Sequence, residues 1–292
     1  MTNLLSPGAL RRLIDDANGP AVRLLDVRWR LDKPDGRAAY LEGHLPGAVY
    51  VDLDRQLASA GEPREGRHPL PRVADLQEAL RSWGVNDGNV VVAYDDVKSM
   101  AAARAWWLLR RGGIDVRVLD GGLRGWTAAG FPLETGEVGV PLGSATLRES
   151  EHGTLTIEES ARFAETGILL DVRAPERYRG EVEPLDPIAG HIPGAVNLPV
   201  GLVLEGDGRL RDASQLAALF ADAGIDSTTP VATYCGSGIT AAHAALALAE
   251  VGIEASVFPG SWSQWSNTPG RPVAVGSLPS GDVLPNSEGE NA

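Results

Sequence analysis

The stretch LLDVR occurs twice in this chain, at Leu24–Arg28 and again about 145 residues later at Leu169–Arg173. The heptapeptide GHLPGAV at Gly43–Val49 returns in the same order as GHIPGAV at Gly190–Val196. Two further matches follow in step: Val90–Asp95 with Pro230–Cys235, and Val118–Trp126 with Val257–Trp265. A period of this length is far too long for a solenoid, so the repeats predict a tandem pair of domains.

Each half alternates short apolar runs with helical segments. The apolar runs are typical of buried parallel strands, because they lack the alternation of a half-exposed strand. This βαβα order predicts an α/β fold with a mostly parallel sheet in each half. The expected strands are Val22–Val27, Val90–Tyr94, Val116–Leu119, Ile168–Val172, Val231–Tyr234 and Ala255–Phe258, and the helices after the central strands are Ala101–Arg111 and Thr240–Val251.

The length of 292 residues agrees with two domains at roughly 150 residues each. We expect an N-terminal domain over residues 1–137, a linker over 138–153, a second domain over 154–275 and a disordered tail over 276–292. The linker is rich in glycine and polar residues, and part of it is compatible with an extended strand. The tail is polar and has no apolar period, which is typical of disorder.

Composition excludes several classes of function. The 26 Lys and Arg against 39 Asp and Glu give a net charge of −13, which disfavours nucleic-acid binding. No 18-residue apolar run is present, so no membrane span is expected. The first twenty residues carry Asp15 and Asp16 and have no continuous apolar core, so a signal peptide is not expected. The single cysteine, Cys235, forms no internal disulfide, and the five histidines show no metal-binding spacing. These features favour a cytoplasmic protein without a metal site.

The segment Cys235–Thr240, CGSGIT, joins an expected strand to an expected helix. Gly236 and Gly238 allow the backbone N–H groups to curl inward as an anion-binding nest. The positive end of the following helix adds to this effect. Both favour a thiolate at Cys235 and a further negative sulfur attached to it. A buried, inert cysteine beside a turn is the alternative interpretation.

A cysteine phosphatase is disfavoured by the same loop. Such enzymes need an arginine six residues after the cysteine to bind phosphate with two hydrogen bonds. That position is Ala241 here, and no lysine or arginine occurs between Cys235 and Val257.

The repeated Asp-Val-Arg strand ends, the paired Gly-His-x-Pro-Gly-Ala motifs and the Gly–Trp motifs resemble those of tandem-domain rhodanese sulfurtransferases. The resemblance covers roughly residues 5–275. It implies two tandem rhodanese-like domains, each with a mostly parallel sheet flanked by helices. The uncharged loop Cys235–Thr240 is similar to that of the 3-mercaptopyruvate branch, whereas thiosulfate sulfurtransferases typically carry Arg and Lys in this loop.

The resemblance also implies a set of site residues. Beside Cys235, the mercaptopyruvate branch uses a Ser-His-Asp set, which corresponds here to Ser237, His68 and Asp54. Its substrate-binding arginine corresponds to Arg177, and a guanidinium suits a carboxylate through two parallel hydrogen bonds. The remaining substrate-binding positions are expected to be those of the loop: Gly236, Gly238, Ile239 and Thr240.

The sequence departs from the family pattern in one place. Animal mercaptopyruvate enzymes carry a second arginine where this chain has Leu185-Asp186. Arg179 is a candidate to replace it, and an ordinary exposed arginine is the alternative. In the N-terminal half Asp95 stands at the cysteine position, and a carboxylate carries no sulfane sulfur, so that domain is expected to be non-catalytic.

The function implied by the resemblance is sulfur transfer in two steps. Cys235 takes sulfur from 3-mercaptopyruvate as a persulfide and passes it to a thiol acceptor such as thioredoxin or glutathione, or to cyanide. No cofactor or metal is required. Thiosulfate is the alternative donor, which would make the protein a thiosulfate:cyanide sulfurtransferase. A non-enzymatic sulfur-carrier or binding module of rhodanese type is the alternative of another class.

Overall fold

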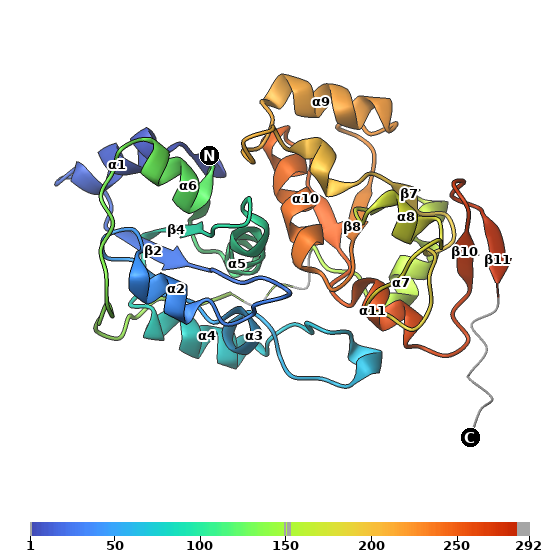
Figure 1. Ribbon diagram of the computed structural model, residues 1–292, viewed down its shortest axis with the longest axis horizontal. Helices are drawn as coiled ribbons and strands as arrows, with labels where there is room; N and C mark the ends of the chain where they lie inside the picture. Colours follow the sequence, from blue (N-terminus) through green and yellow to red (C-terminus); the bar gives the residue numbers. More distant parts are fainter. Residues whose placement is uncertain (1, 149, 151–152, 285–292) are drawn as a thin grey trace. The chain divides into compact units, whose positions relative to one another are not determined.

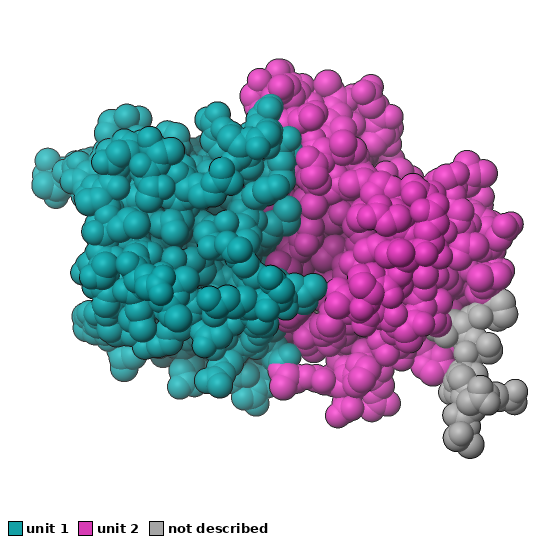
Figure 2. All heavy atoms as spheres, viewed as in Figure 1, with its two compact units in different colours: residues 1–59, 70–151, 204–210 teal, residues 60–69, 152–203, 211–292 magenta. Residues whose placement is uncertain are grey.

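Residues 2–148, 150 and 153–284 are described by a computed structural model of the chain. They divide into two units, coloured separately in Figure 2. Unit 1 consists of residues 1–59, 70–151 and 204–210, and unit 2 of residues 60–69, 152–203 and 211–292. Each unit therefore includes a short segment that the simple division at 138–153 would give to the other, namely 204–210 in unit 1 and 60–69 in unit 2.

The sheets of the two units share one strand order when read from opposite edges, and the sheet of unit 1 has one additional edge strand. The sheet of unit 1 has the order β1-β5-β4-β2-β3, and every described pair in it is parallel. The sheet of unit 2 has the order β7-β6-β8-β9 and is also parallel. Helices flank both sheets (Figure 1). The predicted α/β fold of two tandem domains is thus confirmed, with one additional antiparallel pair, β10 and β11, in unit 2.

The elements of unit 1 match the expected strands and helix to within one residue. They are β1 (Leu4–Leu5), α1 (Pro7–Asp15), β2 (Val22–Asp26), α2 (Arg37–Glu42), β3 (Val49–Tyr50), α3 (Leu53–Gln56), α4 (Val73–Ser82), β4 (Val90–Tyr94), α5 (Met100–Arg111), β5 (Val116–Leu119) and α6 (Gly122–Ala128).

Unit 2 begins with a segment that precedes α4 in the sequence, η1 (Pro63–Glu65), and contacts α11 through it. Its other elements are α7 (Ile157–Arg162), η2 (Phe163–Glu165), β6 (Ile168–Asp171), α8 (Pro175–Tyr178), β7 (Val196–Asn197), η3 (Val200–Val203), α9 (Ala213–Asp222), β8 (Val231–Tyr234), α10 (Ile239–Glu250), β9 (Ala255–Val257), α11 (Ser261–Ser266), β10 (Val273–Val275) and β11 (Asp282–Leu284).

The central strands and the helices after them form the core of each unit. All residues of β4 and β8 are buried, as expected for strands covered on both faces. Helix α10 is almost entirely alanine, leucine and isoleucine on its buried positions, and it packs against β8 and β9. Such a helix is apolar all round because it is buried all round. The loops at residues 94–100 and 234–239 are therefore fixed at both ends, by a buried strand before them and a buried helix after them.

The regions expected to be linker and tail contain ordered structure. In the linker, Gly143 N–H donates to Arg81 O (2.8 Å) and Ala145 N–H to Val85 O (3.0 Å), so this stretch packs in extended form on unit 1. Within the expected tail, β11 pairs with β10. Residues 285–292, the remainder of that tail, lie outside the described residues.

Candidate active site

Cys235 lies at the carboxyl end of β8, directly before α10. Its side chain is buried, and the N–H of Gly238 donates to Cys235 Sγ at 3.1 Å. Gly238 has a φ of 82°, a left-handed conformation that glycine adopts without strain. The glycine thus allows the loop to turn back over the sulfur and present an N–H to it.

The first turn of α11 fixes the loop from the side of its carbonyl groups. Trp262 N–H donates to Cys235 O (3.0 Å), and Ser263 N–H donates to Gly236 O (2.9 Å). The Oγ of Ser261 accepts from the N–H of Cys235 at 3.1 Å. The carbonyl groups of Cys235 and Gly236 are thus committed to α11. Of the inward-pointing N–H groups expected from the sequence, the structure gives that of Gly238 as a donor to the sulfur, and a full anion-binding nest stays a prediction.

Two guanidinium groups approach the loop at Gly236. A Cβ at this position would lie 2.9 Å from Arg67 Nη2 and 3.5 Å from Arg177 Nη1. Arg177 comes from α8, whereas Arg67 comes from the segment 60–69, where its backbone N–H donates to Ser263 Oγ at 2.8 Å. A side chain at position 236 would make the Arg67 guanidinium move, so the glycine lets this group lie close to the residue next to Cys235.

Arg67 was not among the residues expected at the site. The sequence offered Arg179 in place of the missing second arginine. Arg179 instead pairs with Glu181, at 2.7 and 2.8 Å, on the protein surface. Arg67 stands far from the loop in the sequence, and no motif marks it except its position next to His68. Only the folding of segment 60–69 onto unit 2 brings it there.

Two buried carboxylates hold the arginine pair. Glu183 accepts from Arg177 Nε (3.1 Å) and Nη2 (2.7 Å). Asp186 forms an ion pair with Arg67 and a longer one with Arg177, at 3.5 Å. Burial raises the pKa of Asp186; Arg67 acts against this shift, and Glu183 adds to it. The two positive and two negative groups leave this side of the cysteine loop electrically balanced.

Asp171 and Arg173, at the end of β6, belong to the same cluster of arginines and carboxylates. Arg173 binds both carboxylate oxygens of Asp171 and approaches Glu183 at 3.3 Å. Its guanidinium also stacks on Trp262, 4.5 Å from the ring centroid. A buried guanidinium with its hydrogen bonds satisfied in this way is a rigid support. It ties the carboxylate cluster to α11 and so to the cysteine loop.

The other expected site residues are distributed over both units. Ser237 and Ile239 are buried next to Cys235, and Thr240 lies in the first turn of α10. His68 is a buried residue of unit 2, in the segment that also carries Arg67. Asp54 belongs to unit 1, where Trp29 Nε1 donates to its Oδ1 at 2.9 Å and burial raises its pKa. The grouping of Asp54 with His68 and Cys235 stays a prediction.

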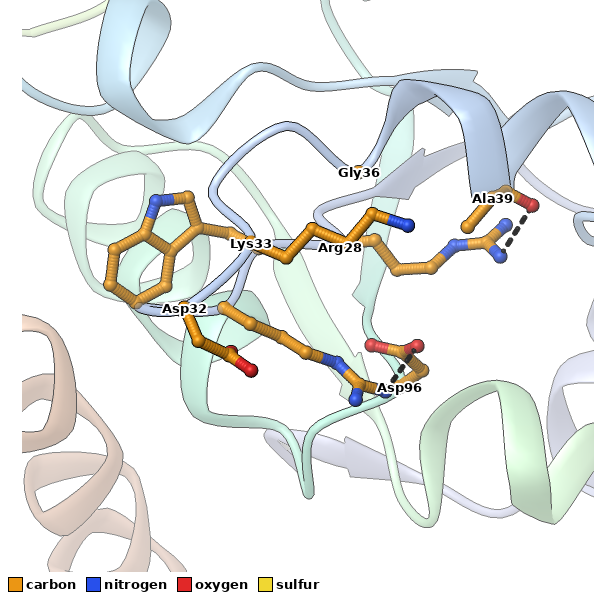
Figure 3. A pocket seen from close by; sticks show the side chains of 8 residues that line it. Arg28, Asp32, Lys33, Gly36, Ala39 and Asp96 are labelled. Atoms are coloured by element: carbon orange, nitrogen blue, oxygen red, sulfur yellow. Dashed lines mark hydrogen bonds and ion pairs between the residues drawn. The ribbon is translucent and has the colours of Figure 1, made fainter.

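In unit 1 the position of Cys235 is occupied by Asp95. Its buried carboxylate accepts four backbone N–H groups, from Val97 (2.8 Å), Ser99, Ala101 and Ala102 (2.9 Å each). At the same ends of β2 and β4 lies a pocket of about 230 Å³. Figure 3 shows Arg28, Lys33 and Asp96 among the side chains that line it. In the loop of unit 1 the Asp95 carboxylate therefore takes up the backbone N–H groups.

The described residues lack two features of other functional classes. Among residues 2–148, 150 and 153–284, no group of three or more His, Cys, Asp or Glu side chains is arranged to hold a metal ion. Over the same residues, no helix combines the length and the apolar character needed to cross a membrane.

Comparison with known proteins gives the same picture as the duplicated motifs. The profile of the Rhodanese-like domain matches residues 6–129 and again residues 157–268. A Mycobacterium tuberculosis protein, the "Putative thiosulfate sulfurtransferase SseB", is 50% identical over 265 residues, which is 89% of this chain and 93% of that protein. The "Probable 3-mercaptopyruvate sulfurtransferase" of Pseudomonas aeruginosa is 42% identical, over 88% of this chain and 93% of its own.

Among solved structures, the 3-mercaptopyruvate sulfurtransferase SseA of Escherichia coli is similar throughout. The TM-score is 0.79 at 31% identity, and the match covers 90% of this chain and 99% of that one. The names of these three relatives agree on sulfur transfer and differ on the donor.

Proposed function

The chain belongs to the rhodanese family and is a sulfurtransferase, and on that basis we propose that it takes sulfur from 3-mercaptopyruvate as a persulfide on Cys235. The observation that carries this proposal is the pairing of a sulfur that accepts an N–H from Gly238 with two guanidinium groups at the adjacent Gly236. A donor that carries both a transferable sulfur and a carboxylate matches both features. The uncharged loop Cys235–Thr240 favours such a donor over thiosulfate.

In the first step the Cys235 thiolate attacks the donor sulfur. The new S–S bond forms as the C–S bond of 3-mercaptopyruvate breaks, and the electron pair leaves as the enolate of pyruvate. A proton then converts the enolate to pyruvate. Ser237, His68 and Asp54 are the proposed route for that proton, by general acid–base transfer. Arg177 holds the donor carboxylate throughout.

In the second step a thiol removes the outer sulfur. An attacking thiolate takes it as a new persulfide, and the electron pair returns to Cys235 as thiolate. The Gly238 N–H and the N-terminal end of α10 stabilise the negative sulfur in both steps. Thioredoxin or glutathione is the proposed acceptor, in the cytoplasm, and cyanide serves in an assay. Covalent transfer of this kind gives ping-pong kinetics.

Thiosulfate is the second candidate donor, and one specific observation favours it. Arg67 provides the additional cation that the loop itself lacks. The carboxylates of Glu183 and Asp186 oppose this, because they neutralise both arginines. The balance favours a donor with a single negative charge.

A single-turnover reaction without acceptor tests the proposal. The protein is mixed with 3-mercaptopyruvate or with thiosulfate, and pyruvate release and the intact mass are followed together. We expect one sulfur atom on Cys235, gained faster from 3-mercaptopyruvate. Faster gain from thiosulfate would reverse the choice of donor. Sulfur that is gained once but never turned over with any thiol or cyanide would favour the non-enzymatic carrier.

A further inference from the structure

The two carboxylates at the arginine pair are held very differently. Besides its two bonds to Arg177, Glu183 accepts from the backbone N–H groups of Leu185 (3.1 Å) and Asp186 (3.3 Å) and approaches Arg173. The contacts described for the Asp186 side chain are only those with Arg67 and Arg177. Glu183 is thus a fixed part of the cluster, whereas Asp186 neutralises the arginine pair through Arg67 Nη1 and Arg177 Nη2 and leaves Arg67 Nη2 and Arg177 Nη1 nearest to Gly236.

The side chain of Asp186 is 2% exposed, but those of Arg67 and Arg177 are 27% and 17% exposed, so solvent partly screens the charges of the cluster. An anion at the arginine pair either displaces this carboxylate or sits beside it. In both cases the cost of binding rises with the charge on the anion. For charges about 5 Å apart at an effective dielectric constant between those of surface and bulk water, each unit of donor charge changes affinity about tenfold.

We propose that Asp186 is a specificity-determining residue that restricts the site to sulfur donors with one negative charge and discriminates against dianions. The proposal rests on the proposed function, since it concerns the donor of the same cysteine. It also accounts for the departure from the family pattern at Leu185-Asp186. Here the second guanidinium comes from Arg67, and the residue that holds it carries the opposite charge.

Binding of two unreactive anions tests this without any sulfur transfer. Pyruvate carries one charge and sulfate two, and calorimetry gives the dissociation constant of each for the full chain. Asp186→Asn keeps the size of the side chain and removes its charge. We expect it to tighten pyruvate binding about tenfold and sulfate binding about 100-fold. Equal changes for the two anions, or no change, would overturn the proposal.

Three further variants keep the test decisive if Asp186→Asn is unstable. Asp186→Glu keeps the charge and should keep the wild-type ratio of the two constants. Arg67→Gln makes the cluster negative and should weaken sulfate binding more than pyruvate binding. Asp222→Asn removes the same charge from the exposed face of α9 and should change neither constant by more than about twofold.

Donor kinetics link the inference to the reaction. In Asp186→Asn the ratio of kcat/KM for thiosulfate to that for 3-mercaptopyruvate should rise about tenfold, through KM and not kcat. An unchanged ratio in an active enzyme would refute the role of Asp186 and leave the proposed function standing. If wild-type Cys235 gains sulfur from neither donor, the proposed function fails, and the two anion constants still decide the role of Asp186.

Discussion

The loops that follow β4 and β8 occupy equivalent positions in the two units. They bind the side chains at these positions, Asp95 and Cys235, in different ways. In unit 1 the Asp95 carboxylate accepts four backbone N–H groups, and the loop is closed around it. In unit 2 the Cys235 sulfur accepts the N–H of Gly238, and two arginines face the adjacent glycine. The loop of unit 1 is thus filled permanently by the Asp95 carboxylate, whereas the loop of unit 2 holds the sulfur of Cys235.

The difference extends to the residue that supports each loop from the next helix. Ser261 and Gly122 are equivalent positions, and both have a φ of 53°. In unit 1 a Cβ at Gly122 would lie 2.3 Å from Asp95 O, so only glycine fits. In unit 2 the serine is accommodated, and its hydroxyl accepts from the N–H of Cys235. The catalytic candidate therefore has a side-chain support that its counterpart lacks.

The largest effect is expected from making the two loops alike. Cys235→Asp places in unit 2 the residue that unit 1 already has. A carboxylate carries no sulfane sulfur, so turnover with either donor should fall by about 10⁴-fold or more, as for loss of a nucleophile. Steady-state assays with both donors measure this. Residual turnover with a mass gain elsewhere in the chain would show that the reactive group is not Cys235.

Removal of Arg177 tests the second contrast. The matching pairs Tyr40–His44 and Tyr178–His191 make Ala39 its equivalent in unit 1, so the cation that we propose binds the donor carboxylate is peculiar to unit 2. Arg177→Ala should lower kcat/KM for 3-mercaptopyruvate by about 2–4 kcal/mol in transition-state terms. Arg179→Ala, which removes an exposed arginine, is the matched control and should change kcat/KM by less than about twofold. Equal effects of the two would remove Arg177 from the site.

These two contrasts also show what the sequence could and could not predict. The duplicated strands, the glycine loop and Cys235 follow from local patterns, because strand burial and backbone turns leave a direct mark on neighbouring residues. The arrangement at Gly236 does not. Arg67 comes from a segment distant in sequence, and it could not be distinguished from other surface arginines without the path of residues 60–69.

The case of Arg179 has the same origin. The sequence lacks a second arginine at Leu185-Asp186, and it left open whether Arg179 replaces it or is an ordinary exposed arginine. Ion pairing decides for the latter, since Arg179 has its own carboxylate partner in Glu181. Asp186, read only as the absence of an arginine, is in the structure a buried partner of two of them.

The closed loop of unit 1 should matter for stability and not for catalysis. In Asp95→Asn one side-chain oxygen becomes an NH₂ group and faces two backbone N–H donors. Loss of these acceptors in a fully buried position should cost about 2–3 kcal/mol in free energy of unfolding. Denaturant unfolding measures this, and kcat per folded molecule should stay within about twofold. A neutral effect on unfolding would show that the four hydrogen bonds do not hold the loop.

The open cluster of unit 2 should respond to pH. Burial raises the pKa of Asp186 above its ordinary value, so its protonated form accumulates at a higher pH than in an unfolded chain. The neutral carboxyl of Asp186 no longer balances the positive charges of Arg67 and Arg177. Sulfate should therefore bind more tightly as the pH falls through the raised pKa of Asp186, by up to about 100-fold in the dissociation constant, the same gain as in Asp186→Asn.

Calorimetric titrations with sulfate over a pH series check this expectation. The matched control is Asp186→Asn, in which the same titration should be nearly flat because the group that titrates has been removed. A slope that persists in this variant would show that Asp186 is not the group responsible for the pH dependence.

The smallest expected effect separates the two contributions of Ser261. Its hydroxyl accepts from Cys235 N–H and donates to Phe258 O (2.9 Å), which stabilises the fold, while its left-handed backbone opposes that gain. Ser261→Ala keeps the strain and loses both bonds, so it should lower the free energy of unfolding by about 1–1.5 kcal/mol. Ser261→Gly, which recreates Gly122 of unit 1, loses the bonds and relieves the strain, so it should be close to neutral. If the two variants are equally destabilised, the backbone at 261 is not strained. The serine would then differ from its glycine counterpart through the hydroxyl alone.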